Sequence, residues 1–154
     1  MRPVDPPDGV IRPPSLGFLG DRAGFTTRGK GLAPPFPAGT VVFGLAQVHS
    51  DRIVRIAGDE DPSSVRRVEA DGLISSAPGG VVLTVRVADC VPVLIASPGG
   101  VAVAAIHAGW RGMAAGIAGR GVRAVCEAAG CNPSDLATAA GPAIGPCCFE
   151  VDEE

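Results

Sequence analysis

The sequence contains no tyrosine and one tryptophan, and aromatic residues make up only 4% of its 154 residues. Few bases could therefore stack on aromatic side chains, and a formal net charge of −3 offers no broad basic surface for phosphates. No apolar run approaches the roughly 20 residues that span a bilayer, and the proline-rich start lacks the apolar segment of a secretion signal. We therefore expect no nucleic-acid partner, no membrane partner and a cytoplasmic location.

What the chain does contain favours one sheet-rich domain. Hydrophobic residues make up 46% of the sequence and charged residues 19%, which argues against disorder. A chain of this length can bury about two-thirds of its unfolded surface. The 22 glycines and 15 prolines indicate many turns and few long helices. We expect a Pro-rich leader at 1–16 and a single domain at 17–154.

Apolar and β-branched runs mark the expected strands. The glycine-rich stretch 17–27 predicts a short hairpin, 32–39 a loop and 58–69 an exposed charged segment. One amphipathic helix is expected over 112–129, ending at Gly130, with a short helical turn after Asn132. Strands are expected at 40–48, 52–57, 81–87, 91–96 and 101–106.

The last two strands form a hairpin whose register has a chemical consequence. A two-residue loop at Pro98 and Gly99 would pair residues whose numbers sum to 197, so Cys90 would face His107. Directly opposed residues have Cβ atoms about 4.5–5.5 Å apart, which suits two ligands of one metal ion. A bulge that shifts the register by one residue would separate the pair.

The sequence has only two histidines, His49 and His107, and each follows an apolar strand. With Cys90 they could bind zinc and leave a fourth position for water, whose pKa zinc lowers to about 7. The five cysteines, an odd number with an adjacent pair, do not suggest a disulfide framework. The residues alone leave open the alternative that both histidines are satisfied core residues and that Cys90 is a small buried hydrophobe.

Other motifs are weaker. Residues 109–116 follow a strand and open a helix, but Trp110 and Arg111 stand where a dinucleotide fingerprint needs glycine, which excludes NAD. Arg111 could help to hold an anion. The Cys147-Cys148 pair lacks the rest of the zinc-deaminase signature, and Cys126 and Cys131 are expected to pack in or near the helix.

Five segments in order resemble the signature of the YfiH/YlmD family, also called polyphenol-oxidase laccase-like proteins, peptidoglycan editing factors or purine nucleoside phosphorylases of the LACC1/FAMIN type. The resemblance covers residues 25 to the C-terminus. It implies an α+β fold with a central mixed β-sandwich flanked by helices, of the CNF1/YfiH-like type. The segments are QVHSDR (47–52), ADGLI (70–74), ADCVPV (88–93), HAGWRG (107–112) and GPAIGPCC (141–148).

The resemblance also implies a site and an activity. It assigns zinc, rather than copper, to His49, Cys90 and His107. Phosphorolysis of adenosine, inosine, guanosine and methylthioadenosine is implied, together with adenosine deamination, so the protein would be a transferase and a hydrolase. The partners would be a small-molecule nucleoside and phosphate, with a homodimer left open. The other implied residues are Asp89, Arg28 and Gln47 as catalytic groups and Arg111, Gly141 and Gly145 as substrate-binding groups.

Family members continue well beyond the point that corresponds to Glu154, so the resemblance implies that the C-terminal part is lacking. A second hypothesis is a cysteine hydrolase or amidase that edits peptidoglycan precursors, with Cys90 as nucleophile and His107 as base. A third is a truncated zinc-binding scaffold without activity. A multicopper oxidase is excluded because two histidines cannot hold several copper ions.

Overall fold

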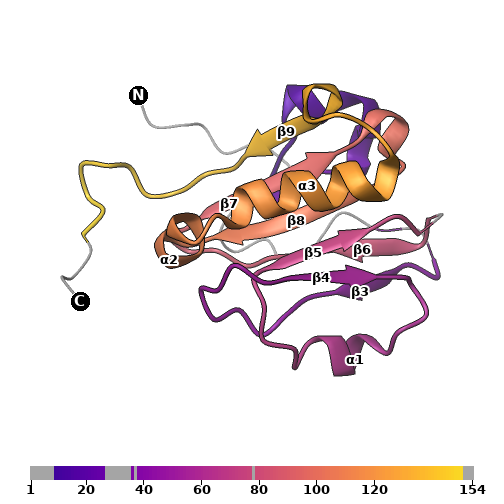
Figure 1. Cartoon of the computed structure of the whole chain (residues 1–154), viewed down its shortest axis with the longest axis horizontal. Helices are drawn as coiled ribbons and strands as arrows, with labels where there is room; N and C mark the ends of the chain where they lie inside the picture. The colour runs from indigo at the N-terminus through magenta and orange to yellow at the C-terminus, as the bar shows by residue number, and fades with distance from the viewer. Residues whose placement is uncertain (1–8, 27–35, 37, 78, 151–154) are drawn as a thin grey trace.

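A five-stranded mixed sheet forms the centre of the computed structural model, which describes residues 9–26, 36, 38–77 and 79–150 (Figure 1). The strand order is β4-β5-β8-β7-β9; β4 and β5 are parallel, and the other neighbours are antiparallel. The strands are β4 (Ile53–Ile56), β5 (Gly72–Ser75), β7 (Val91–Ala96), β8 (Val103–Ala108) and β9 (Ala137–Ala140).

Two small sheets accompany it. Strand β1 (Val10–Ile11) pairs antiparallel with β2 (Phe25–Thr26), and β3 (Val41–Phe43) pairs parallel with β6 (Val81–Leu83). Strand β1 lies within the expected leader, and the division into leader and domain stays a prediction. With the helices described below, these sheets make an α+β fold, as expected from the sequence.

The prediction of a hairpin at 17–27 is wrong. That segment lies mostly in a 3₁₀ helix, η1 (Pro14–Arg22), and β2 instead pairs with β1. The reason is the burial of two leucines, in a helix that is kinked at Leu16 and Gly20, where φ and ψ are not helical. Leu16 and Leu19 are both buried, against Ala96 and Ala139 of the main sheet. Most of the loop expected at 32–39 lies outside the described residues, which include only 36, 38 and 39 of this range.

The single helix expected over 112–129 is two helices, α2 (Trp110–Ala114) and α3 (Ile117–Ala129). Gly116 has φ of 86°, a left-handed conformation that interrupts the helix. The predicted end at Gly130 is confirmed, as is the short turn η3 (Pro133–Asp135) after Asn132. In the charged segment 58–69, which is mostly exposed as expected, lies a short helix, α1 (Pro62–Val65).

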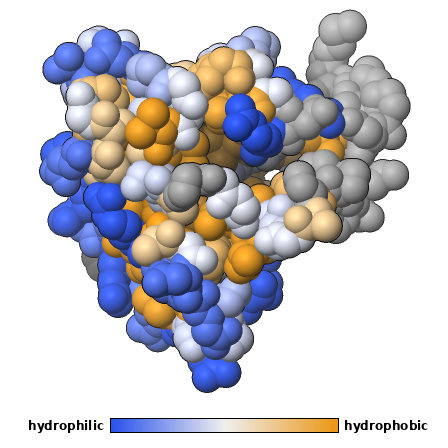
Figure 2. All heavy atoms as spheres, turned by 90° about the vertical axis from the view of Figure 1, so that its right-hand side faces the viewer, coloured by the Kyte–Doolittle hydropathy of each residue, from blue (hydrophilic) through white to orange (hydrophobic). Residues whose placement is uncertain are grey.

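Helix α3 covers one face of the main sheet (Figure 1). Its buried residues Ile117, Gly121 and Val125 recur every four positions, so they form one stripe against Ile95 and Ile106. A second core cluster lies among β3, β4, β5 and α1, and a third under η1. In Figure 2, which faces the right-hand side of Figure 1, hydrophobic residues are visible between hydrophilic ones on that face.

The hairpin of β7 and β8 exists, but its register differs from the expectation by two residues. His107 is opposite Pro92, not Cys90, because the connection runs from Ser97 to Ala102 and contains a 3₁₀ turn, η2 (Pro98–Gly100). The Ser97 hydroxyl accepts a 2.9 Å hydrogen bond from the Ala102 amide and so closes this wider loop. A shift of two keeps every side chain on its face of the sheet, so the convergence of Cys90 and His107 survives.

The strands expected at 40–48 and 81–87 end early, at Phe43 and Leu83. Beyond them a side chain takes the place of the backbone ladder. The Gln47 carboxamide donates to the Arg86 carbonyl at 2.7 Å and accepts from the Arg86 amide at 2.8 Å. The two segments therefore stay side by side without strand pairing. No helix among the described residues is long and apolar enough to cross a membrane.

Candidate metal centre

Sheet topology brings the three predicted ligands to one end of the main sheet. His49 and Cys90 precede β4 and β7, and His107 lies near the end of β8. Because β8 runs antiparallel to β7 and to β5, and β5 runs parallel to β4, these strand ends meet at the same end of the sheet. Residues far apart in the sequence thus become neighbours.

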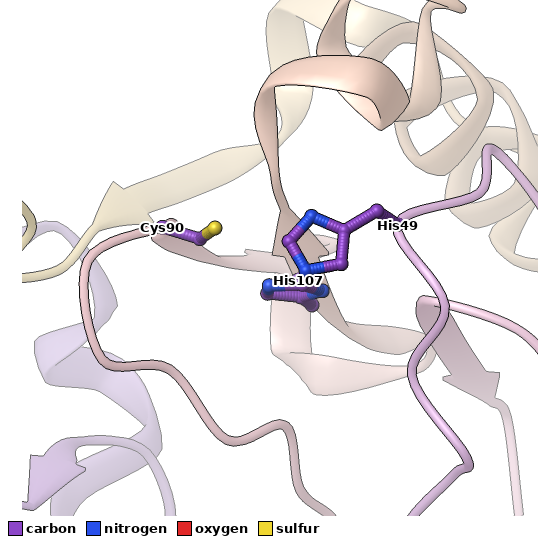
Figure 3. Close-up of side chains that lie close together, drawn as sticks. All are labelled: His49, Cys90 and His107. Carbon is purple, nitrogen blue, oxygen red and sulfur yellow. The ribbon is translucent and has the colours of Figure 1, made fainter. Parts of the chain in front are cut away.

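The ligand atoms of His49, Cys90 and His107 lie within 4.8 Å of one another (Figure 3). The two imidazole rings meet edge to face, with centroids 4.8 Å apart and an interplanar angle of 86°. The Cys90 sulfur points toward both rings. His107 is buried, Cys90 partly buried and His49 exposed, so the cluster opens to solvent on the His49 side. It is the one such group of three ligand residues within the described part of the chain.

Asp71, which directly precedes β5, holds the buried histidine in place. Its carboxylate is fully buried and its Oδ1 lies 2.7 Å from His107 Nδ1. The backbone adds a second tie, since the His107 amide donates to the Asp71 carbonyl at 2.7 Å. A carboxylate can only accept, so His107 Nδ1 carries the hydrogen and Nε2 is left as the ligand atom.

The same carboxylate fixes the loop that carries His49. The amides of Val48, His49 and Ser50 donate to it at 3.3, 3.0 and 2.7 Å, and the Ser50 hydroxyl donates at 2.7 Å. Three consecutive N–H groups that converge on one anion form a nest. His49 has φ of 61°, the one positive value outside glycine among the described residues. This conformation costs about 1–3 kcal/mol, and the Asp71 contacts hold it.

Burial opposes ionisation of Asp71, but the hydrogen bonds from His107, from Ser50 and from the Val48 amide outweigh it and hold the pKa of Asp71 below its usual value. Asp71 is therefore a buried anion that joins two of the three candidate ligands. Sequence reasoning gave it no role, although it lies in one of the five signature segments. An acidic residue directly before a fully buried strand was the available signal.

Two glycines at the start of α2 allow the His49 loop to lie against this helix. A Cβ atom on Gly109 would be 2.5 Å from His49 Nδ1, and one on Gly112 would be 2.6 Å from the Ser50 carbonyl oxygen. Any side chain at either position would push the loop away. The glycines of the HAGWRG segment therefore act through close packing against the loop.

Cys90 is held as a thiol unless a cation is bound. Burial raises its pKa, and the negative charges of Asp89 and Asp71 raise it further. Among the described residues, no hydrogen bond joins its sulfur to either imidazole. A thiol with a raised pKa and no hydrogen-bonded base is a weak nucleophile, whereas a bound metal ion would stabilise its thiolate.

The other predicted site residues differ in how close they come to the cluster. Arg28 lies outside the described residues. Both ends of the Gln47 carboxamide are engaged by the Arg86 backbone, which favours a positioning role. Asp89 is exposed and adjacent to Cys90, and its carbonyl accepts a 2.9 Å hydrogen bond from the Ile144 amide.

Gly141 donates its amide to the Pro92 carbonyl at 2.9 Å, so the chain after β9 runs beside the segment that carries Cys90. A Cβ atom on Gly141 would meet the Phe25 ring at 2.5 Å, which explains the glycine by packing. Gly145 is partly buried beyond it. Arg111 is exposed on α2, with its guanidinium 5.2 Å from the Trp110 ring centroid. Roles in substrate binding stay predictions for all three residues.

Two hollows of the described surface lie away from the cluster. One, of about 500 Å³, is lined by residues around β3 and β6, including Val41 and Val81. The other, of about 550 Å³, lies between the start of β4 and α3 and contains the Asp51–Arg120 ion pair of 2.7 Å. The cluster of His49, Cys90 and His107 lines neither of these two hollows.

Comparison with known proteins adds the family. Residues 22–154 match the family model described as multi-copper polyphenol oxidoreductase laccase. A purine nucleoside phosphorylase of Pseudomonas aeruginosa is 43% identical over 110 residues, which are 71% of this chain and 41% of that protein. The purine nucleoside phosphorylase YfiH of Escherichia coli is 41% identical over 110 residues, 71% of this chain and 42% of that protein.

Among solved structures, YlmD from Geobacillus stearothermophilus superposes with a TM-score of 0.62 at 39% identity, covering 73% of this chain and 43% of YlmD. YfiH of Bacillus licheniformis gives a TM-score of 0.62 at 37% identity, covering 72% of this chain and 43% of that protein. The chain thus spans less than half the length of these relatives.

Proposed function

The chain belongs to the multi-copper polyphenol oxidoreductase laccase family, which includes YfiH and YlmD, and from that premise we propose that it is a zinc-dependent enzyme of purine nucleoside phosphorolysis. The observation that carries the proposal is the convergence of His49, Cys90 and His107, with Asp71 behind them. The curated relatives that match most of the chain are named purine nucleoside phosphorylases, which supplies the reaction.

The donor set supports zinc as the ion. Two imidazoles and one thiolate are donors that zinc accepts, and three protein ligands leave one position open, as in catalytic zinc sites. Bonds of 2.0–2.3 Å to a shared ion place donors about 3–4 Å apart, and the donors of the cluster lie within 4.8 Å of one another, so small side-chain movements would bring them onto one ion. The presence of only two histidines in the sequence disfavours several copper ions. A zinc ion held there would supply Lewis-acid chemistry at the open position.

The chain's own residues would hold and orient the reactants. Asp71 directs His107 Nε2 toward the cluster and keeps the His49 loop in place. Asp89 lies beside Cys90 on the exposed side, where it could handle a proton of the substrate. We assign the phosphate to Arg111 and to Arg28, with backbone amides near Gly141 and Gly145 alongside the Cys90 segment.

The cysteine hydrolase fits the geometry less well. A Cys–His dyad needs the imidazole within hydrogen-bond reach of the sulfur and a lowered thiol pKa. Here no hydrogen bond among the described residues joins the Cys90 sulfur to an imidazole, the pKa of Cys90 is raised, and a second histidine joins the cluster. All three features are suited to a ligand cysteine.

The test combines turnover with metal content. The purified chain is loaded with zinc and given inosine and phosphate, and free hypoxanthine is measured; guanosine, adenosine and methylthioadenosine follow. We expect phosphate-dependent release of base, and release of inosine from adenosine if the site also deaminates. Cys90→Ala should abolish both activities, whereas Cys126→Ala, which removes a thiol in α3, should not.

The outcomes separate the hypotheses. Bound zinc without release of base or inosine from any nucleoside would overturn the enzymatic proposal and leave a metal-binding scaffold. Hydrolysis of a peptidoglycan precursor by the zinc-free protein and by His49→Ala, but not by Cys90→Ala, would favour the cysteine hydrolase, because a dyad needs neither zinc nor His49.

A further inference from the structure

A second pair of cysteines lies at the C-terminal end of α3, outside the metal centre. Gly130, with φ of 65°, ends the helix in a left-handed conformation. The amides of Gly130 and Cys131 both donate to the Cys126 carbonyl, at 2.8 and 3.2 Å. The second of these bonds is the six-residue closure of a Schellman motif, in which the side chains of its first and last residues contact each other. These two residues are Cys126 and Cys131.

The motif places Cys126 and Cys131 at the same helix end, linked by the bond between the Cys131 amide and the Cys126 carbonyl. Both cysteines are partly buried and neither is in a disulfide. The pair is remote from the metal ligands, because α2 follows the end of β8 and α3 runs back along the sheet, so its last turn lies at the opposite end from α2 (Figure 1). Chemistry at this pair can therefore be separated from chemistry at Cys90.

The other close pair is less suited to a bridge. Cys147 and Cys148 are exposed, and their sulfur atoms are 3.1 Å apart. Adjacent residues have Cα atoms about 3.8 Å apart, however, below the 4.4–6.8 Å range usual for disulfides. A bridge between them would be strained, whereas the closure of a helix end brings two residues together without such a constraint.

We propose that Cys126 and Cys131 are a redox site that forms a reversible disulfide by exchange with a small disulfide such as glutathione disulfide. One cysteine of the pair loses its proton to solvent, and its thiolate attacks one sulfur of glutathione disulfide, which gives a mixed disulfide and releases one glutathione thiolate. The other cysteine then loses its proton to solvent and attacks the sulfur of the first, releasing the second glutathione thiolate. Two electrons pass from the cysteine pair to glutathione disulfide, and the end of α3 becomes covalently linked to the segment that leads to η3.

Either thiol can attack first, and the other thiol at the same helix end then resolves the mixed disulfide. Cys126→Ser should accumulate glutathione on Cys131, and Cys131→Ser should accumulate it on Cys126, because each variant lacks the resolving thiol.

The full chain is equilibrated with glutathione disulfide, remaining thiols are alkylated under denaturing conditions, and the protein is cut with trypsin and a glutamate-specific protease. Cleavage after Arg123 and Glu127 isolates Cys126 in the peptide 124–127. We expect this peptide to be disulfide-linked to the peptide that contains Cys131, with the link assigned by fragmentation. The link should be absent in Cys131→Ser and retained in Cys147→Ser.

Oxidation should also raise the thermal unfolding midpoint, since the bridge restricts the unfolded chain, and a dithiol reductant should reverse the rise. The proposal is overturned if wild-type protein ends with separate glutathione adducts on Cys126 and Cys131, or if the peptide 124–127 is recovered only in alkylated form. It is equally overturned if the linked partner is Cys147 or Cys148.

Discussion

Replacement of Asp71 by asparagine keeps the shape of the side chain but removes its charge and one acceptor oxygen. In the wild type, Oδ2 accepts from the Val48 amide and from the Ser50 amide and hydroxyl, and Oδ1 faces the His49 amide and His107 Nδ1. An asparagine NH₂ at the Oδ2 position would meet three donors. The less costly orientation places it at Oδ1, where it faces two.

In that orientation the NH₂ group donates to His107 Nδ1, which must become an acceptor. The ring hydrogen then moves to Nε2, the atom that should bind the metal, and the His49 amide loses its acceptor. A buried donor without a partner costs about 1–3 kcal/mol, and weaker hydrogen bonds from Ser50 add about 1 kcal/mol. We expect Asp71→Asn to lose about 2–4 kcal/mol of unfolding free energy and 10–100-fold of zinc affinity, the usual effect at residues that orient a ligand.

Two assays measure these effects. Urea unfolding of the zinc-free protein gives the stability change, and competition with a chromophoric chelator gives the zinc affinity. Asp59→Asn is the matched control, because it removes the same charge from an exposed residue and should change neither value appreciably. Zinc affinity within twofold of the wild type in Asp71→Asn, or a stability loss below about 0.5 kcal/mol, would refute the role of Asp71.

Three further predictions address other contacts. Gly109→Ala should lower zinc affinity about tenfold or more, because its Cβ atom would displace the nearby imidazole ligand. Gly119→Ala, whose Cβ atom has room within α3, should instead stabilise the protein by about 0.5–1 kcal/mol. Equal zinc affinity in the two variants would contradict the predicted effect of Gly109→Ala. Hydrogen bonds from Ser63 and Ser64 hold the pKa of Asp61 at about 2, below its unfolded value, so this helix cap stabilises the fold above about pH 4 and is lost as pH falls toward 2. The stability difference between the wild type and Asp61→Ala should therefore shrink over that range. A difference that is independent of pH would exclude the effect. Arg120→Gln should cost less than about 1 kcal/mol and less still in high salt, because its ion pair with Asp51 is largely exposed; a larger loss in urea unfolding would show that the pair anchors the His49 loop.

The sequence predicted the hairpin of β7 and β8 and the end of α3 because alternation, turn residues and Gly130 are local signals. The register of that hairpin was not predictable in the same way, because it depends on how Ser97 closes the loop. The 3₁₀ helix η1 was missed for a related reason: its leucines pack against Ala96 and Ala139, which are distant in the sequence.

The candidate ligands were predictable from the scarcity of histidine and from the ordered signature segments. The role of Asp71 was not, because it comes from five hydrogen bonds that exist only after the loop around His49 folds onto the start of β5. The left-handed conformation of His49 depends on the same contacts and is unusual for any residue other than glycine. Local pattern cannot reveal an anion enclosed by backbone amides.

We expect His49, Cys90 and His107 to bind one metal ion together. Cobalt(II) substitution followed by visible and near-ultraviolet absorption tests it most directly, because tetrahedral cobalt absorbs strongly in the visible and a thiolate ligand adds a charge-transfer band. We predict one cobalt per chain with both features, loss of the thiolate band in Cys90→Ser, and at least tenfold weaker binding in His49→Ala and His107→Ala. A thiolate band that persists in Cys90→Ser, or cobalt binding that is unchanged in both histidine variants, would show that these residues do not bind one metal ion together.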